Sequence, residues 1–217
     1  GCGMWGRNLA RNLAALGCLA AVADRHTDRA DAFAAEFGTD SRSVDDLLTG
    51  DGLDGVVVAS AAPTHAELAC RALASGRHVY VEKPFAMTLE EAETMAAAAS
   101  VNGRQLMVGH LIRHHDAFCE LQEQVAAGVI GELRHVTANR LAMGRIRATE
   151  SVIHDLCPHD LSLILALMGE APTDLACNGA SHVTAGMPDM LSTFFRFAGG
   201  RSGSMTTSWM CPYKEHR

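Results

Sequence analysis

A glycine-rich segment at the start of the sequence and an aspartate further on have the spacing of a nucleotide-binding site. Residues 1–6 read G-x-G-x-x-G and open directly into a predicted helix. Glycines let the backbone turn tightly and approach a pyrophosphate, whose charge is stabilised at the positive end of a helix. Asp24 ends the next predicted strand, 18 residues after Gly6. A carboxylate there accepts hydrogen bonds from ribose hydroxyls and repels a 2′-phosphate, which favours NAD. Arg25 leaves NADP open, because a guanidinium pairs with phosphate. The alternative is a helix-capping turn beside a surface aspartate.

Two further loops follow predicted buried strands. Lys83 lies between Glu82 and Pro84, directly after a strand, so it is held at the edge of the sheet where ligands bind. There it could polarise a substrate hydroxyl and stabilise a developing alkoxide, whereas the alternative is a Glu–Lys pair on a solvated loop. The small residues of 60–65 would let a cofactor lie across the strand ends. For His65 alone, we favour a helix N-terminal residue with a satisfied ring.

A third group precedes an apolar helix in the second half of the chain. Asp155 and His159 are four residues apart, and Pro158 lies between them. A histidine with a pKa near neutrality is suited to take a proton from a carbinol as hydride leaves. Two alternatives stay open: a structural histidine at a helix N-terminus, and a zinc site built on His154, Asp155 and His159. The zinc site is secondary, because no fourth ligand has a helpful spacing.

The first half of the chain alternates short apolar strands with helices, which predicts an α/β fold with a doubly wound parallel sheet. The strand that should lead into Gly1 is absent from the sequence. The expected helices cover 7–16, 27–37, 43–48, 64–75 and 88–101, and the expected strands cover 18–23, 55–60, 77–81 and 105–109.

The pattern changes after about residue 110, where partial alternation predicts a mainly antiparallel sheet with helices on one face. We expect an NAD(P)-binding Rossmann domain over 1–109 and a substrate-binding, catalytic α+β domain over 110–217. The second domain is expected to be incomplete, because its last residues read as a strand running on into a further segment. Its expected helices are 113–127 and 159–168, and its expected strands are 132–140, 174–183, 190–198 and 202–210.

Composition limits the partners. The formal net charge of −7 argues against nucleic acid and anionic membranes, both of which need a basic face. No run of about 18 apolar residues and no secretory signal is visible. The seven cysteines are scattered and never form C-x-x-C, so we expect reduced thiols in a cytoplasmic protein rather than disulfides or a zinc site.

Taken together, these segments resemble the glucose–fructose oxidoreductase / inositol dehydrogenase (Gfo/Idh/MocA) family along the whole chain. The resemblance rests on GCGMWG, VADR, VVVASAAPTHAELACRAL, VYVEKPFAMTLEEA, LMVGHLIRHHDAF and HDLCPHDLSLILALMG. It implies an NAD(P)-dependent dehydrogenase with Lys83, Asp155 and His159 as catalytic residues. It also implies cofactor contacts from Gly1, Gly3, Met4, Trp5, Gly6, Asp24, Arg25, Ser60, Pro63, His65, Glu82 and Lys83.

A narrower resemblance, carried by GHLIRHHDAF, NRLAMGRIRATESVIHDLCPHDLSLILALMGE and SWMCPYKEHR, is to members that oxidise UDP-N-acetylglucosamine at carbon 3. Within that comparison the expected substrate contacts are Arg113, Asn139, Arg140, Arg147 and His159, with the arginines suited to a diphosphate. The sequence departs from relatives at His154, where many have an aromatic residue, at Asp116, where many have proline, and at Ser60, where threonine is frequent.

The resemblance also implies a small-molecule sugar substrate and a homo-oligomer, either a dimer or a tetramer. An inositol, polyol or dihydrodiol dehydrogenase of the same family is the alternative within the enzyme class. A non-catalytic NAD-binding sensor and a zinc hydrolase are the alternatives outside it.

Overall fold

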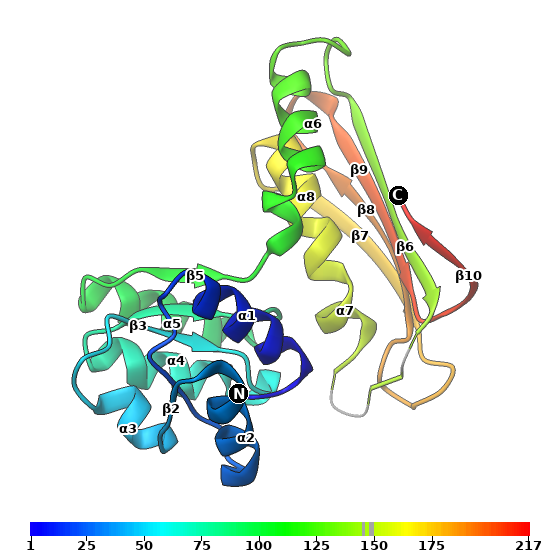
Figure 1. Ribbon diagram of the computed structural model, residues 1–217. Helices are drawn as coiled ribbons and strands as arrows, with labels where there is room; N and C mark the ends of the chain where they lie inside the picture. The colour runs from blue at the N-terminus through cyan, green and yellow to red at the C-terminus, as the bar shows by residue number, and fades with distance from the viewer. Residues whose placement is uncertain (145, 148–149) are drawn as a thin grey trace. The chain divides into compact units, whose positions relative to one another are not determined.

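This computed structural model describes residues 1–144, 146–147 and 150–217, and it divides into two compact units (Figure 1). The first unit is Gly1–Gly109 and the second is His110–Arg217. The helices of the first unit are α1 (Met4–Ala15), α2 (Thr27–Phe37), α3 (Val44–Thr49), the 3-10 turn η1 (Ala62–Thr64), α4 (His65–Ala74) and α5 (Leu89–Val101). Its strands are β1 (Ala21–Val22), β2 (Asp40–Ser41), β3 (Gly55–Val58), β4 (His78–Val81) and β5 (Leu106–Val108).

All strand pairs in the first unit are parallel, which confirms the predicted α/β class. They form two sheets, one with β1 beside β2 and one with the order β3-β4-β5. In the strand order of the doubly wound fold, β2 and β1 occupy the positions on one side and β3, β4 and β5 occupy those on the other. The central position of that order falls between β1 and β3. Among the described residues no strand occupies that position. A cavity of about 710 Å³ is lined there by β1 and β3, together with α1, α3 and α4.

The core of the first unit forms where apolar strands meet apolar helix faces. Strands β3 and β4 contain five valines in eight residues, and their inward side chains pack against α4 and α5. Burying each such side chain stabilises the fold by about 1.5–3 kcal/mol. The fully buried members of this core include Val58, Val79, Val81, Leu73 and Met95.

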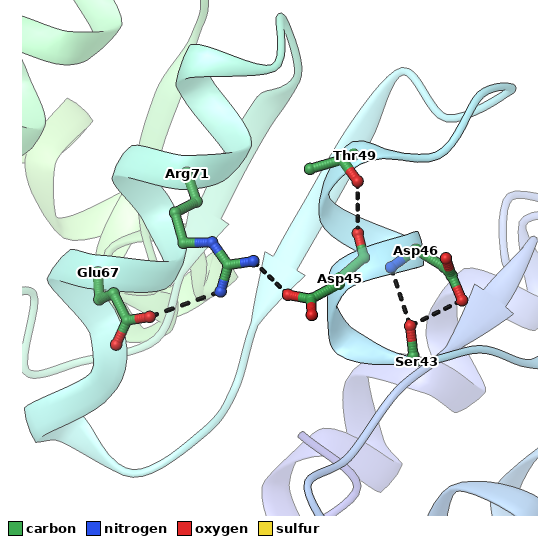
Figure 2. Close-up of polar contacts among 6 residues, drawn as sticks. All are labelled: Ser43, Asp45, Asp46, Thr49, Glu67 and Arg71. Atoms are coloured by element: carbon green, nitrogen blue, oxygen red, sulfur yellow. Dashed lines mark hydrogen bonds and ion pairs between the residues drawn. The ribbon is translucent and has the colours of Figure 1, made fainter.

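Helix α3 is fixed at its start and along its side (Figure 2). Ser43 is its N-cap, and its hydroxyl accepts a hydrogen bond from the Asp46 backbone N–H at 3.0 Å. The Asp45 carboxylate pairs with the Arg71 guanidinium on α4, which also lies 3.5 Å from Glu67 one turn earlier. This pair links α3 to α4 at the side of the cavity.

The second unit contains one sheet and its covering helices. Its helices are η2 (Leu111–His114), α6 (Asp116–Ala126), α7 (Val152–Asp155), α8 (Cys157–Met168) and η3 (Ala198–Gly200). Its strands are β6 (His135–Met143), β7 (Asp174–Ala180), β8 (Met190–Arg196), β9 (Ser202–Ser208) and β10 (Met210–His216).

The five strands have the order β10-β6-β9-β8-β7, and every pair is antiparallel except β6 with β9. Strand β8 alternates strictly, with Leu191, Thr193 and Phe195 buried and their neighbours exposed. The buried side chains pack against Ile164 and Met168 of α8, which lies along the sheet in Figure 1. The predicted, mainly antiparallel sheet with helices on one face is confirmed.

Three local features differ from expectation. The short strand β2 was not predicted, because two polar residues carry no strand pattern. The helix expected at 159–168 begins at Cys157 and follows the separate four-residue helix α7. The strand expected at 202–210 ends at Ser208, because the Trp209 backbone N–H turns to the Asp189 carbonyl oxygen at 3.0 Å. Within the described ranges, no helix has the length and apolar character needed to cross a membrane.

Candidate functional site

The glycine turn places three glycines in three different surroundings. A Cβ atom built on Gly1 would lie 2.5 Å from the Ala59 carbonyl oxygen, and one on Gly6 would clash with the Gly1 carbonyl oxygen. A Cβ atom on Gly3 would meet nothing within 4 Å. Gly1 and Gly6 therefore allow close packing of α1 onto the end of β3, while Gly3 leaves open space in front of the N-terminus of α1. No side chain caps that helix end, and its first turn carries no acidic residue. The turn thus fits a pyrophosphate.

Asp24 joins the end of β1 to this turn. Its carboxylate accepts hydrogen bonds from the backbone N–H groups of Cys2 at 2.8 Å and His26 at 2.9 Å. Burial opposes its ionisation, but these two donors and the Arg29 guanidinium at 3.7 Å hold the pKa of Asp24 below its ordinary value. The group is therefore a fixed negative charge beside the glycine turn at neutral pH, which is the charge that would favour NAD over NADP there.

His65 ties together two loops at the carboxyl ends of the strands. Its ring is 1% exposed. Nδ1 lies 2.8 Å from the Pro84 carbonyl oxygen and Nε2 lies 3.1 Å from that of Ser60. The ring is thus enclosed between the loop after β3 and the loop after β4. In that place it sets the shape of both loops.

Glu82 and Lys83 follow β4 directly. The Glu82 carboxylate is buried and accepts hydrogen bonds from the Tyr80 hydroxyl at 3.0 Å and the Lys83 backbone N–H at 3.2 Å. Burial, together with the Glu82 charge, raises the pKa of Tyr80 well above its ordinary value. Gly109 makes room for this pair, since a Cβ there would lie 2.9 Å from a Glu82 oxygen. The half-buried Lys83 therefore leaves the sheet from a rigid base.

Asp155 is the last residue of α7 and is buried. One carboxylate oxygen accepts a hydrogen bond from the Trp209 indole N–H at 3.2 Å, and the other lies 2.9 Å from the Arg147 guanidinium. His159 lies half-buried in the first turn of α8, four residues further on. Neighbouring His154 is turned to Ser151, with Nδ1 3.1 Å from its hydroxyl. Within the second unit, Asp155 and His159 thus lie on consecutive helices.

The remaining predicted substrate residues have different surroundings. Arg140 forms a two-bond ion pair with Asp160 of α8, with nitrogen–oxygen distances of 2.8 and 2.7 Å. Asn139 donates from its side-chain amide to Glu215 of β10 at 2.8 Å. Arg113, on η2, is exposed. Arg147 is thus brought to Asp155, while Arg140 and Asn139 are engaged within the sheet and α8.

The other predicted cofactor residues line the turn or its borders. Met4 and Trp5 lie in the first turn of α1 with 88% and 41% exposure. Arg25 and Pro63 are exposed, and the Ser60 hydroxyl lies 2.6 Å from that of Thr64. Among residues 1–144, 146–147 and 150–217, no three His, Cys, Asp or Glu side chains gather as a metal site.

Comparison with known proteins matches both units. Residues 1–110 match the model of an oxidoreductase family with an NAD-binding Rossmann fold, and residues 118–217 match the GFO/IDH/MocA C-terminal domain. The chain belongs to the Gfo/Idh/MocA family. Its predicted membership is confirmed, and its first unit carries the NAD-binding fold of the family.

Two curated members show the range of relatives. The chain is 35% identical over 210 residues to the UDP-N-acetylglucosamine 3-dehydrogenase of Acidithiobacillus ferrooxidans, covering 96% of this chain and 65% of that protein. It is 26% identical to the inositol 2-dehydrogenase of Rhizobium meliloti, covering 90% of this chain and 62% of that protein. The chain therefore spans less than two thirds of the length of these curated relatives.

Solved structures agree with this membership. The UDP-N-acetylglucosamine 3-dehydrogenase GnnA of A. ferrooxidans superposes with a TM-score of 0.90 at 34% identity, covering 100% of this chain and 70% of that one. GenD2 from gentamicin A biosynthesis, solved in complex with NAD, superposes with a TM-score of 0.91 at 28% identity, covering 98% and 65%.

Sequence reasoning missed three residues whose contacts the structure shows. Trp209 donates a hydrogen bond to Asp155. Asp160 pairs with Arg140, and buried Asp189 accepts hydrogen bonds from His182. Asp160 was visible as the last residue of the H-D pair, but its partner lies on a strand 20 residues earlier. No local pattern marks a contact at that distance.

Proposed function

We propose that the protein is an NAD-dependent dehydrogenase that oxidises a sugar hydroxyl to a ketone, with UDP-N-acetylglucosamine oxidised at carbon 3 as its reaction. The observation that carries the proposal is the glycine turn with its fixed aspartate. Gly3 leaves space for a pyrophosphate at the start of α1, and Asp24 presents a negative charge beside it. That charge repels the 2′-phosphate of NADP, so NAD is the proposed cofactor.

The catalytic roles are assigned to one residue of the first unit and two of the second. The glycine turn and Asp24 would hold NAD, which would supply the nicotinamide that takes up the hydride. His159 takes the hydroxyl proton, Asp155 orients and tunes His159, and Lys83 stabilises the developing alkoxide. The buried surroundings of Asp155 and the rigid base of Lys83 support these assignments. We accordingly assign residues 1–109 to cofactor binding and residues 110–217 to substrate binding and catalysis.

The nucleotide-sugar substrate is supported by the 35% identity to the A. ferrooxidans enzyme. Arg113 and Arg147 are the proposed contacts to the diphosphate, because guanidinium groups match phosphate geometry. Arg140 is already paired with Asp160, so we assign it a structural role rather than a contact to the diphosphate. The similarity to an inositol 2-dehydrogenase makes inositol the second candidate substrate. We further propose a cytoplasmic homo-oligomer.

The proposed reaction is tested with the natural full-length protein, NAD⁺ and a panel of UDP-sugars and inositols, with NADH absorbance as the readout. We expect NADH with UDP-N-acetylglucosamine and little with myo-inositol. The reverse order would replace the substrate and keep the enzyme class. NAD binding without NADH from any sugar or polyol would instead indicate a sensor.

Two variants separate binding from chemistry. Gly3→Ala should fold normally, because no atom lies within 4 Å of the added methyl group, yet it should weaken NAD binding by occupying the space for the pyrophosphate. His159→Ala should lower turnover by roughly two to four orders of magnitude and leave NAD affinity unchanged. Normal NAD binding by Gly3→Ala would refute the proposed pyrophosphate site at the glycine turn. Normal turnover by His159→Ala would refute His159 as the proton acceptor.

A further inference from the structure

Trp209 is a buried aromatic residue at the junction of two strands. It lies between β9 and β10, and it is 2% exposed. Its backbone is held on both sides: its N–H donates to the Asp189 carbonyl oxygen at 3.0 Å, and its carbonyl oxygen accepts from the Gly144 N–H at 2.9 Å. The indole packs in the core of the second unit with Val152 and Cys157. The ring therefore has a single, fixed position.

The one polar atom of this ring is directed at Asp155. An indole has a single donor and no acceptor, and here the Nε1–H donates to Asp155 Oδ2 at 3.2 Å. The other oxygen of Asp155 faces the Arg147 guanidinium at 2.9 Å. The Arg147 side chain is 45% exposed, so water screens its charge. The indole bond is the buried and unscreened part of this clamp.

The backbone opposite the ring is shaped to admit it. A Cβ atom on Gly144 would lie 2.7 Å from Cδ1 of the Trp209 indole, closer than real contacts allow. Any larger residue at position 144 would displace the ring from its place beneath α7. The end of β6, the β9–β10 junction and α7 thus combine to fix one carboxylate, although Trp209 and Asp155 are 54 residues apart.

We propose that Trp209 is a positioning residue for Asp155: its indole N–H fixes the orientation of the carboxylate and favours its ionised form. The inference rests on the proposed function, in which Asp155 orients and tunes the proton acceptor His159. Filling the core does not need this arrangement. A phenylalanine would supply most of the apolar packing without placing a donor 3.2 Å from the carboxylate oxygen.

The first test compares Trp209→Phe with Phe197→Leu in the full-length enzyme. Phe197 is a matched control, because it is 4% exposed in the same core cluster. Both variants lose packing, but only Trp209→Phe removes the hydrogen bond to Asp155. We expect Trp209→Phe to lower kcat roughly ten- to hundredfold. The KM for NAD should stay unchanged. The acid limb of the pH–rate profile should move to higher pH, because a carboxylate without its donor has a higher pKa. Phe197→Leu should lower stability and leave the pH profile in place.

The second test does not depend on activity. Trp5 and Trp209 are the two tryptophans of this sequence, and the Trp209 emission is obtained as the difference between the enzyme and its Trp209→Phe variant. We expect its fluorescence to change with acid pH in one titration, and Asp155→Asn to abolish that titration. A pH profile of Trp209→Phe that matches Phe197→Leu, or a titration unchanged by Asp155→Asn, would overturn the proposal. Full activity of Asp155→Asn would instead refute the proposed function, and the fluorescence titration would still decide the contact.

Discussion

Replacing Arg140 separates a structural ion pair from a substrate contact. Its guanidinium makes two hydrogen bonds to Asp160, at 2.8 and 2.7 Å. The two side chains are 12% and 5% exposed. Arg140→Met keeps most of the apolar stem and removes the charge. Asp160 is then a buried carboxylate without its partner.

The expected cost follows from that burial. Removing one member of a buried ion pair typically lowers the free energy of unfolding by about 3–5 kcal/mol, because the remaining charge is left uncompensated. For a chain of this size each kcal/mol corresponds to about 2–4 °C in Tm, which gives a fall of about 6–20 °C. The double variant Arg140→Met/Asp160→Leu should recover most of the loss, since apolar residues of similar volume replace such pairs well.

Urea unfolding followed by circular dichroism measures the free energy of unfolding, and thermal unfolding with the same signal measures Tm. Arg134→Met is the matched control, because its ion pair with Glu132 is 83% and 69% exposed. It should change the free energy of unfolding by less than about 0.5 kcal/mol. Unchanged stability of Arg140→Met together with a raised KM for the sugar would refute the reasoning and return Arg140 to the substrate.

Two further predictions concern groups outside the proposed chemistry. Burial raises the pKa of Cys157 to about 11, so iodoacetamide at neutral pH should modify exposed Cys18 and leave Cys157 intact until the protein unfolds, as mass spectrometry can show. Burial opposes ionisation of Asp189, but its hydrogen bonds from His182 hold the pKa below the ordinary value. This carboxylate therefore stabilises the fold above about pH 4, and that effect is lost as the pH falls through its lowered pKa. Asp189→Asn should be less stable than the natural protein at pH 7, and the two stabilities should become equal in acid.

Each of these predictions has an outcome that contradicts it. Equal labelling rates for the two cysteines would show that the Cys157 thiol is accessible. A constant stability difference between Asp189→Asn and the natural protein from pH 7 to acid would mean that Asp189 does not titrate with folding.

The fold was predictable from sequence because its signals are local. The valine run of β3, the glycine turn and the alternation of β8 each show their structure within a few neighbouring residues. Strand β2 and helix α7 escaped prediction because two and four residues are too few to show a period. The register of the second sheet, including the parallel pair of β6 and β9, depends on long-range contacts that no single segment reveals.

The site was predictable only in part, for the same reason. The motif around Asp155 supplied the candidate chemical groups, but their surroundings come from residues far away in the chain. The resemblance to nucleotide-sugar enzymes grouped Arg140 and Arg147 as substrate contacts, whereas the structure brings them to two different carboxylates. The two arginines carry the same charge and lie close together in the chain, so the sequence alone does not distinguish them. They meet different carboxylates because of how α7 and α8 pack on the sheet.

The two carboxylates, Asp155 and Asp160, lie in one short segment but have different surroundings. Asp160 meets a guanidinium through two parallel hydrogen bonds, in a pair that is nearly enclosed on both sides. That geometry uses both of its oxygens and anchors α8 to β6. Asp155 has a neutral indole donor on one oxygen and a half-exposed guanidinium on the other. A carboxylate whose cationic partner is half-exposed and screened by water keeps more of its charge than one neutralised by a buried cation. Within the proposed function, Asp155 is therefore the carboxylate assigned to tune His159, while Asp160 anchors the helix on which His159 lies.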